Sequence, residues 1–351
     1  MDKKLIEQEM QQLDLVLKAR AKLPELRKQA GIPDIVRSGK TKKILGVCFG
    51  KKNGISDMAM KAASVGAAEY GMEFELIRAQ ALTIKPCIAC NSCTPLFLGG
   101  DRLPKCPHKD DLQWLMQKIV VEDNAIILSV PCFHLMGNSL AVNCVQRLHQ
   151  TMFTYYDYFF TRKKIGAMIA VGSGTDGWMS MANEASRVLL EHMAVTVDEV
   201  AVESSLRDID WVERCKQLGR NVAQAMQKPI EEVSFMGDKH PYACPVCNSK
   251  VMMMQDYKPR PSEPGELRYK PGHVLCSVCG THGTFRFEGD ELKVEWNQWD
   301  IDHARCSDYG NCEHTNTIMR RMSPGYPECR ESKAKWEEVK DVKLPEVKPE
   351  Q

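Results

Sequence analysis

Five short apolar runs, each followed by a turn and a stretch of helical character, constrain the fold of this chain more than any other feature. The runs occupy residues 44–49, 74–78, 125–130, 165–171 and 195–202. Apolar runs of this length that alternate with helices are typical of parallel strands buried on both faces and joined by right-handed crossovers. The sequence therefore predicts an α/β protein with a five-stranded parallel sheet.

The loops that follow the first, third and fourth runs are polar or rich in glycine. In a flavodoxin-like sheet of order 2-1-3-4-5, ligands bind beyond the carboxyl ends of the strands that flank the switch point, which are strands 1 and 3. The loops at 50–56, 131–138 and 172–178 would then meet at one edge. Together they predict a pocket for a ring-shaped cofactor that carries a phosphate.

The turn at 50–56 is the candidate phosphate site. Backbone amides at such a turn, and at the start of the helix after it, can bind a phosphate, and Ser56 can cap the helix and donate its hydroxyl. The turn has neither the Gly-Lys-Ser/Thr of a Walker loop nor the Gly-x-Gly-x-x-Gly of a dinucleotide fold. An ordinary turn at the entry to a helix is the alternative interpretation.

A cysteine-rich segment follows the second run, between Lys85 and Asp111. Cys87, Cys90 and Cys93 recur at every third position, and Cys106 follows after a loop rich in glycine and proline. Thiolates with this spacing cannot share one face of a strand, but a looping backbone can bring them to one point. That geometry favours an iron–sulfur cluster. A zinc site and a reduced loop without metal are the alternatives.

A second cysteine pattern lies near the C-terminus, where Cys244 and Cys247 form one Cys-x-x-Cys pair and Cys276 and Cys279 form another. Two such pairs predict a tetrahedral four-thiolate site. Strand-like stretches near them, at 250–254, 283–287 and 291–296, resemble a zinc ribbon. Structural zinc is favoured, while a single iron, as in rubredoxin, and an empty site are the alternatives. Metal binding would supply folding energy to a segment with so small a core.

Three further cysteines and two histidines follow that pattern at spacings that match no standard metal site. Unliganded thiols are therefore the favoured interpretation. The residues are Cys306, Cys312, Cys329, His303 and His314.

Charge and cysteine use limit the cellular setting. The 351 residues include 47 basic and 46 acidic side chains, for a net charge of +1, so no electrostatic argument for nucleic acid arises. The N-terminus has no apolar signal core, and no apolar run reaches the roughly 18 residues that a membrane span needs. The fifteen cysteines cluster as Cys-x-x-Cys and not as scattered pairs. We therefore expect a cytoplasmic protein with no membrane contact.

Two further segments have competing interpretations. Apolar residues at helical spacing over 2–30 predict a helix that Pro24 kinks or splits. It would pack on its own domain or on a neighbouring subunit, and we favour the subunit. A helix is also expected from the third loop to about Tyr156. The aromatic run at 153–160 would wall a substrate cavity or a subunit interface.

Residues 42–205 resemble the NAD(P)H-dependent FMN reductase family, in its iron–sulfur flavoprotein branch. That branch pairs a phosphate turn ending in Gly-Asn-Ser/Thr with a compact cysteine segment ending in Asp-Asp, a strand ending in Ser-Pro-x-Tyr and a glycine-rich loop. The counterparts here are Asn53 to Ser56, Cys87 to Asp111, Ser129 to Phe133 and Gly172 to Gly177. The chain departs from the family at Phe49-Gly50-Lys51, where Ser-Pro-Arg is usual, and at Pro-Cys-Phe, where Pro-x-Tyr is usual.

The resemblance implies FMN bound without a covalent bond. Its phosphate would meet Lys51, Asn53, Gly54 and Ser56. Its ring would lie against two loops, made of Pro131, Cys132, Phe133, His134, Leu135 and Met136, and of Gly172, Ser173, Gly174, Asp176 and Gly177. It also implies a [4Fe-4S] cluster on the four cysteines of the cysteine-rich segment, near enough to exchange electrons with the flavin, and a homodimer or homotetramer.

The predicted domain organisation follows from these segments. We expect an N-terminal helix at 1–35, a flavodoxin-like FMN-binding domain at 42–230 with an inserted cysteine loop at 85–108, a zinc-ribbon-like domain at 240–300, and a C-terminal arm at 301–351.

The predicted function is that of an FMN-dependent iron–sulfur oxidoreductase. It would pass electrons between NAD(P)H, or a one-electron carrier such as ferredoxin, and a small organic acceptor. His134 has a suitable pKa in its free form for proton donation, although a polar loop residue with a hydrogen-bond partner is the favoured interpretation. The alternatives are an electron-transfer flavoprotein that docks a redox partner without catalysis, and a metal-binding scaffold or redox sensor.

Overall fold

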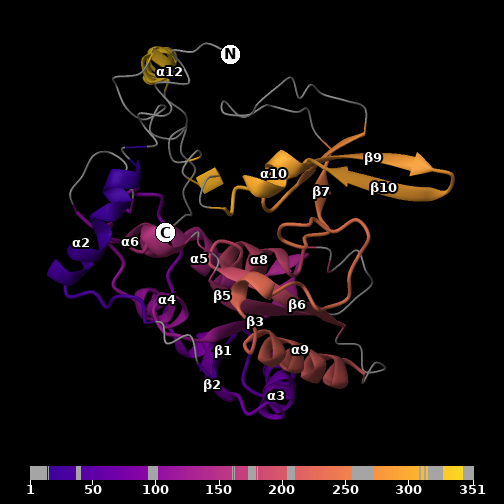
Figure 1. Ribbon diagram of the computed structural model, residues 1–351. Coiled ribbons are helices and arrows are strands. Elements are labelled where there is room, and N and C mark those ends of the chain that lie inside the picture. Colours follow the sequence, from indigo (N-terminus) through magenta and orange to yellow (C-terminus); the bar gives the residue numbers. More distant parts are fainter. Residues whose placement is uncertain are drawn as a thin grey trace, which may run out of the picture.

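The computed structural model contains a large sheet with helices on both faces and a small antiparallel sheet beside it (Figure 1). It describes residues 14, 16–36, 41–93, 102–159, 161, 163–172, 179, 181–203, 210–254, 272–307, 310–311, 314 and 327–342. Four of the predicted flavin contacts lie outside the described residues, namely Ser173, Gly174, Asp176 and Gly177.

The large sheet confirms the predicted parallel order. Its strands are β1 (Lys43–Cys48), β2 (Glu73–Arg78), β3 (Ala125–Phe133), β5 (Lys164–Gly172) and β6 (Ala194–Glu203), in the order β2-β1-β3-β5-β6. In chain order these are the first to fifth parallel strands, which gives 2-1-3-4-5. A sixth strand, β4 (Met136–Gly137), was not expected, and it pairs antiparallel with the end of β3.

Helices cover both faces of this sheet, as a parallel sheet requires. One face carries α3 (Ile55–Ala68) and α9 (Trp211–Ala225). The other carries α4 (Leu112–Val120), α5 (Ser139–Gln146), α6 (Leu148–Thr154), α7 (Tyr156–Phe159) and α8 (Glu184–Leu190). Short 3-10 turns at Ala79–Ala81 and Ile230–Glu232 complete this part of the chain.

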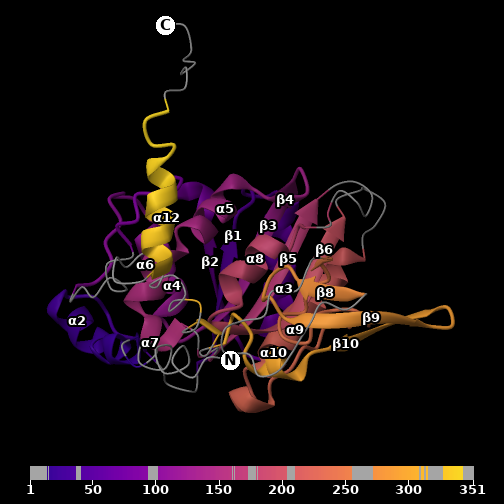
Figure 2. The ribbon, with the colours of Figure 1, turned by 90° about the horizontal axis from the view of Figure 1, so that it is seen from above.

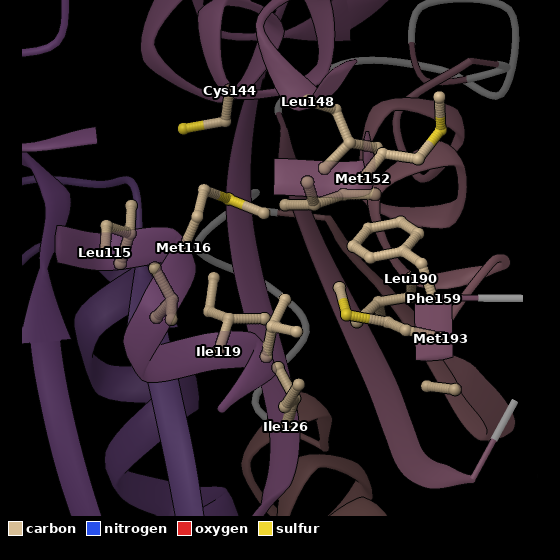
Figure 3. Close-up of a cluster of buried hydrophobic side chains, with 14 of the residues drawn as sticks. Leu115, Met116, Ile119, Ile126, Cys144, Leu148, Met152, Phe159, Leu190 and Met193 are labelled. Atoms are coloured by element: carbon tan, nitrogen blue, oxygen red, sulfur yellow. The ribbon is translucent and has the colours of Figure 1, made fainter. Parts of the chain in front are cut away.

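Successive side chains of the central strand divide between two cores. Ile126 and Leu128 belong to the core beneath α4 and α5, whereas Ile127 belongs to the core beneath α3 and α9. This alternation follows from the two-residue period of a strand. In Figure 3, Ile119 of α4 lies beside Ile126 of β3. An apolar run without polar interruptions is therefore what β3 needs.

The segment expected to form one helix to about Tyr156 breaks at Arg147 and at Tyr155, which separates α5, α6 and α7. The breaks let the aromatic run turn into the core, where Phe153, Tyr156 and Phe159 are buried. These rings pack within their own domain, and a role of this run as the wall of a substrate cavity or as a subunit interface stays a prediction.

The N-terminal helix also packs on its own domain. Residues 16–21 are helical, the helix breaks at Lys22, and α2 (Leu23–Gln29) begins with Pro24 in its first turn, so the predicted split is confirmed. The buried Arg27 guanidinium pairs with Asp157 at 2.6 Å and donates to Thr154 O at 3.0 Å. These contacts belong to α6 and α7 of the same chain, whereas the preferred contact with a neighbouring subunit stays a prediction.

The small sheet comprises β7 (Met252–Met253), β8 (His273–Cys276), β9 (His282–Glu288) and β10 (Glu291–Trp296), in the antiparallel order β10-β9-β8-β7. The stretches predicted at 283–287 and 291–296 lie within β9 and β10, which extend away from the large sheet (Figure 2). The first predicted stretch forms only a two-residue strand. Helices α10 (Gln298–Asp302) and α12 (Pro327–Glu337) follow. In the part of the chain that is described, no helix has the length and apolarity of a membrane span.

A close contact of two glycines joins α3 to α9. A Cβ atom on Gly66 would lie 1.9 Å from Lys216 O, and one on Gly219 would lie 1.9 Å from Ala63 O. Each glycine therefore lets one helix rest on the backbone of the other. Carbon and oxygen atoms cannot approach that closely, so any side chain at either position forces the helices apart.

Replacing Gly219 with alanine should destabilise the protein, because the added methyl group meets the carbonyl of Ala63. We expect the free energy of unfolding to fall by about 1–3 kcal/mol or more. Urea unfolding monitored by circular dichroism measures this change. The matched control is Val65→Ala on the exposed face of α3, which should change stability by about 0.5 kcal/mol or less. Equal stabilities of the two variants would contradict the proposed helix contact.

Candidate functional site

Hydrogen bonds tie together the carboxyl ends of β1 and β3. Asn138 Nδ2 donates to Phe49 O at 2.9 Å, and the Asn138 amide donates to Pro131 O at 3.0 Å. The Phe49 amide in turn donates to Ser129 O at 2.8 Å. Asn138 also caps α5, because its side chain accepts a hydrogen bond from the Ala141 amide. Asn138 was predicted to lie in the loop at 131–138, but its role in linking the two strand ends was not predicted.

The end of β5 joins the same edge. A Cβ atom on Gly172 would lie 3.2 Å from the Cβ of Cys132, so the strand ends touch at this point. The structure therefore brings Gly172 and Cys132 together, and the sequence predicted that the loops at 131–138 and 172–178, to which they belong, lie at one edge. Figure 2 shows β4 and the start of α5 at this end of the sheet.

The turn between β1 and α3 is tightly packed around Ser56. A Cβ atom on Gly50 would lie 2.6 Å from the Ser56 Cβ, so only glycine fits there. Gly54 precedes the helix in an extended conformation, and its amide donates to Lys51 O at 3.0 Å. The first intrahelical bond is donated by the Met58 amide to Gly54 O. The amides at the start of α3 precede that bond, which makes this end suited to an anion.

A buried carboxylate, that of Asp57, holds this turn in place. It accepts hydrogen bonds from the Asn53 amide at 3.0 Å and from Arg78 Nε at 2.8 Å, and it pairs with Lys61 at 3.2 Å. Burial raises the pKa of Asp57, but the hydrogen bonds from Arg78, Asn53 and Lys61 outweigh burial and lower it. Asp57 thereby keeps Asn53 at a φ of 58°, in the left-handed region.

Asp57 and Arg78 were not among the predicted site residues. The signal for Asp57 was its position, since an acidic residue in the first turn of a helix favours that end. Lys51 and Lys52, by contrast, project from the turn into solvent. They are placed where a phosphate bound at the start of α3 would meet positive charge.

The loop after β3 is a tight hairpin, which the sequence did not predict. His134 and Leu135 form its two-residue turn with φ values of 49° and 73°, and Phe133 pairs with Met136 across it. Positive φ at both positions is typical of a type I′ turn. The side chains of Phe133, His134, Leu135 and Met136 are exposed at the carboxyl edge, and Phe133 is 65% exposed. Burial raises the pKa of the neighbouring Cys132 thiol.

The four cysteines of the cysteine-rich segment gather in one region. Burial raises the pKa of the Cys93 thiol, and the nearby charges of Cys87, Cys90 and Cys106 raise it further. Cys87 and Cys90 are exposed, and the other two are half-buried. Among the described residues, these sulfurs do not form a group tight enough for a single ion. A cluster with several metal atoms needs thiolates spread around a larger core.

The backbone around Cys87 and Cys90 resembles that of the C-terminal cysteine pairs at one position. The Ala89 amide donates to Cys87 Sγ at 3.4 Å, and Asn91, which follows Cys90, has a φ of 56°. Asn248 and Gly280, which follow the second cysteines of the C-terminal pairs, also have positive φ, at 58° and 73°. The similarity is limited to this position, because Ala89 also has a positive φ, at 52°, and no residue between the cysteines of the C-terminal pairs does.

Charged side chains fasten both ends of the cysteine-rich segment. Asp111 accepts a hydrogen bond from the Thr83 amide at 2.7 Å, and Asp110 accepts one from the Lys85 amide at 2.8 Å. Arg147 donates to both carboxylate oxygens of Asp110 and to Lys85 O. The residues after Cys106 therefore hold the residues before Cys87. Arg147 was not predicted to belong to this site.

The C-terminal cysteine pairs form a compact buried group of four. Cys244 Sγ lies 3.4 Å from Cys279 Sγ, and Cys247 Sγ lies 3.5 Å from Cys276 Sγ. All four sulfurs lie within 4.8 Å of one another, so the predicted grouping is confirmed. Hydrogen bonds among the four thiols lower the pKa of Cys244 and of Cys276 and raise the pKa of Cys247 and of Cys279. Cys306 is buried nearby but is not part of the group.

Two arginines dock this four-cysteine site on the large sheet. Arg187 of α8 donates to Cys247 O and pairs with the buried Glu199 of β6. Arg305 donates to Val278 O and pairs with Glu191 at 2.8 Å. One cysteine pair is thus held to the middle of α8, and the other is held to Glu191, just after α8. No sequence pattern had indicated these contacts.

Comparisons with known proteins agree with this architecture. Residues 43–206 match the family model for NADPH-dependent FMN reductase. A solved structure named flavone reductase is similar to the chain, with a TM-score of 0.60 and 23% identity over 87% of this chain and 100% of that chain. The shared fold therefore extends beyond the region that the family model matches. A comparison with curated proteins gives no match.

Two other solved structures align with lower TM-scores. RosB with bound 8-demethyl-8-formylriboflavin-5'-phosphate has a TM-score of 0.40 and 14% identity, over 71% of this chain and 99% of that chain. An azoreductase from Bacillus anthracis str. Sterne has a TM-score of 0.39 and 14% identity, over 54% of this chain and 100% of that chain.

The family match coincides with the large sheet, from the start of β1 to just beyond the end of β6. Residues 43–206 are therefore similar to the NADPH-dependent FMN reductases.

Proposed function

We propose that this chain is an FMN-dependent iron–sulfur oxidoreductase that passes electrons between NAD(P)H, or a one-electron carrier, and a small organic acceptor. The observation that carries the proposal is the meeting of β1, β3 and β5 at one edge, where Asn138 ties Phe49 to Pro131. An anion-binding helix end and an exposed apolar hairpin adjoin that edge. A cofactor with a phosphate and a flat ring needs both features.

The residues of the turn after β1 fit the phosphate of FMN. Lys51, Asn53, Gly54 and Ser56 surround the start of α3, and the packing of Ser56 on Gly50 fixes the turn before any ligand binds. A turn that is already in its binding conformation loses less entropy on binding. Asp57 supports this arrangement from within the core, because it holds Asn53.

The hairpin after β3 fits the ring. Phe133, Leu135 and Met136 project apolar surface at the carboxyl edge, where they would cover a flat ring and exclude water. When bound, FMN accepts two electrons and can release them one at a time. His134, at the tip of the turn, is placed among these side chains. Its role as a proton donor stays a prediction.

The cysteine-rich segment supports a [4Fe-4S] cluster as the second redox group. Three features fit a cluster: the proximity of the four thiols, the Ala89 amide bonded to Cys87 Sγ, and the fastened loop ends. Amide hydrogen bonds to sulfur stabilise cluster thiolates. A one-electron group beside a two-electron group would couple a carrier such as ferredoxin to the acceptor.

We infer that the C-terminal four-cysteine group holds a structural zinc ion. Its sulfurs are buried and grouped for tetrahedral coordination, and Cys279 Sγ lies 3.0 Å from Thr281 Oγ1, which can donate to it. Iron is the alternative metal for four thiolates. The ion would stabilise the small sheet, whose own core is limited.

We propose a planar aromatic compound as the acceptor. The apolar hairpin favours a flat, apolar molecule, and the similar solved structure is named flavone reductase. A flavone is accordingly a suitable probe, together with a quinone as a general acceptor. Turnover of either by NADH or NADPH would support the enzyme. The homodimer or homotetramer implied by the family stays a prediction.

The exposed hairpin also favours a second candidate function, an electron-transfer flavoprotein that docks a redox partner. Exposed apolar side chains such as Phe133 suit a protein contact as well as a small molecule. The two functions differ in their donor. Rapid bleaching of the flavin by NADH or NADPH with turnover of the acceptor supports the enzyme, whereas reduction by ferredoxin alone supports the carrier.

Replacing Ser56 with alanine should weaken FMN binding by about 10-fold to 100-fold, because one hydrogen bond to a charged phosphate is lost. Riboflavin, which lacks the phosphate, should bind the variant and the parent equally. Fluorescence titration of the apoprotein measures both affinities. Ser64→Ala, which removes a hydroxyl farther along α3, is the control. Full FMN affinity in the Ser56 variant would count against the phosphate site.

Replacing Cys276 with serine should remove the C-terminal metal, because three thiolates and a hydroxyl bind zinc far less tightly than four thiolates. Elemental analysis of the parent should find about one zinc per chain at this site, and the variant should lose it. The control is Cys306→Ser, which changes a buried cysteine outside the four-sulfur group and should keep the metal. Retention of zinc by the Cys276 variant would exclude the assigned ligands.

A further inference from the structure

Arg147 forms a buried link between a helix and the cysteine-rich segment. It lies at the junction of α5 and α6. Its side chain is 4% exposed, and that of its partner Asp110 is 1% exposed. One guanidinium nitrogen, Nη2, donates to Asp110 Oδ1 at 2.9 Å and to Cys106 Sγ at 3.5 Å. The other, Nη1, donates to Asp110 Oδ2 at 2.5 Å and to Lys85 O at 2.9 Å.

Asp110 orients this guanidinium. A planar guanidinium that binds both oxygens of one carboxylate has little rotational freedom, so its remaining hydrogen-bonding directions are fixed. One of those directions points at Cys106 Sγ. The pair is also short of water, and a charge–sulfur contact is stronger in a medium of low dielectric constant. The geometry therefore aims positive charge at one of the proposed cluster ligands.

We propose that Arg147 raises the reduction potential of the iron–sulfur cluster through its hydrogen bond to Cys106, an inference that rests on the proposed function. Reduction adds negative charge to a cluster and its thiolates. A donor and a positive charge next to one thiolate stabilise the reduced form more than the oxidised form. Arg147 is therefore a positioning and tuning residue, since it contacts a ligand and not a reacting atom.

The helix that ends at Arg147 also fixes where the cluster lies relative to the carboxyl edge of the sheet, where we propose that the flavin binds. This edge is called the flavin edge below. α5 has 8 residues, which corresponds to about 12 Å of helix. Asn138 anchors its first turn to Phe49 at the flavin edge. Asn143, within α5, donates to Ile84 O at 3.4 Å, just before the cysteine-rich segment. One short rigid element therefore holds both proposed redox groups.

The experiment compares anaerobically purified full-length parent with Arg147→Met and Arg147→Lys variants. Iron and acid-labile sulfide are quantified first, and the midpoint potential of the cluster is then measured by redox titration monitored by electron paramagnetic resonance. In Arg147→Met we expect the equilibrium constant for reduction to fall about 10-fold, a midpoint about 59 mV more negative for one electron. Lysine keeps the charge but loses the planar fork, so its shift should be smaller.

Lys109→Met is the matched control. Lys109 is an exposed cation three positions from Cys106 in the sequence, and solvent screens its charge. Its removal should leave the midpoint within error of the parent. A shift equal to that of Arg147→Met would overturn the proposal, because any nearby charge would then have the same effect.

The remaining outcomes separate this inference from the proposed function. If the parent protein contains no iron or acid-labile sulfide, the proposed cluster is refuted, and so is the tuning role of Arg147. A loaded parent whose Arg147 variants keep the parental midpoint refutes only the tuning role. If Arg147→Met loses the cluster, the proposal is tested by the midpoint potential of the cluster in Arg147→Lys, which should be more negative than that of the parent. If both variants lose the cluster but keep FMN, Arg147 is needed for assembly and the tuning role is refuted.

Discussion

The structure depends on one constraint, which is that parallel strands buried on both faces end together at a single edge. Ile126 and Ile127 face opposite cores, so a shift of β3 by one residue would move each side chain into the opposite core. Fixed registers give fixed strand ends, and the ends of β1, β3 and β5 then meet without any long-range signal of their own. Asn138 adds hydrogen bonds to this arrangement, but the sheet creates it.

The sequence predicted the parts of the fold that depend on local pattern. The five apolar runs match the observed strands to within a few residues, because strands buried on both faces leave continuous apolar runs. Cys244, Cys247, Cys276 and Cys279 were grouped correctly because the geometry of metal binding restricts cysteine spacing. The turn between β1 and α3 was located by its glycines, which the packing of Gly50 against Ser56 explains.

Features that depend on contacts between distant residues were missed. At positions 134 and 135, histidine is moderately enriched at positive φ but leucine is not, so no turn signal marked both positions, and the hairpin after β3 was not foreseen. The breaks at Arg147 and Tyr155 occur in a stretch of ordinary helical residues. A sequence does not distinguish a buried charged pair, such as Arg147 with Asp110, from charged residues on the surface, because only the fold brings the two partners together.

The two ends of the cysteine-rich segment are held close together, and this affects how the length of the segment can vary. Asp110 and Asp111 hold Lys85 and Thr83, so the segment leaves and re-enters the domain at nearly one point. Lengthening a loop whose ends already meet costs only a slowly growing closure entropy, about 0.6 kcal/mol for each doubling. The segment can therefore change in length independently of the sheet. Relatives of this chain can insert or delete residues between Cys93 and Cys106 without altering the strands beneath.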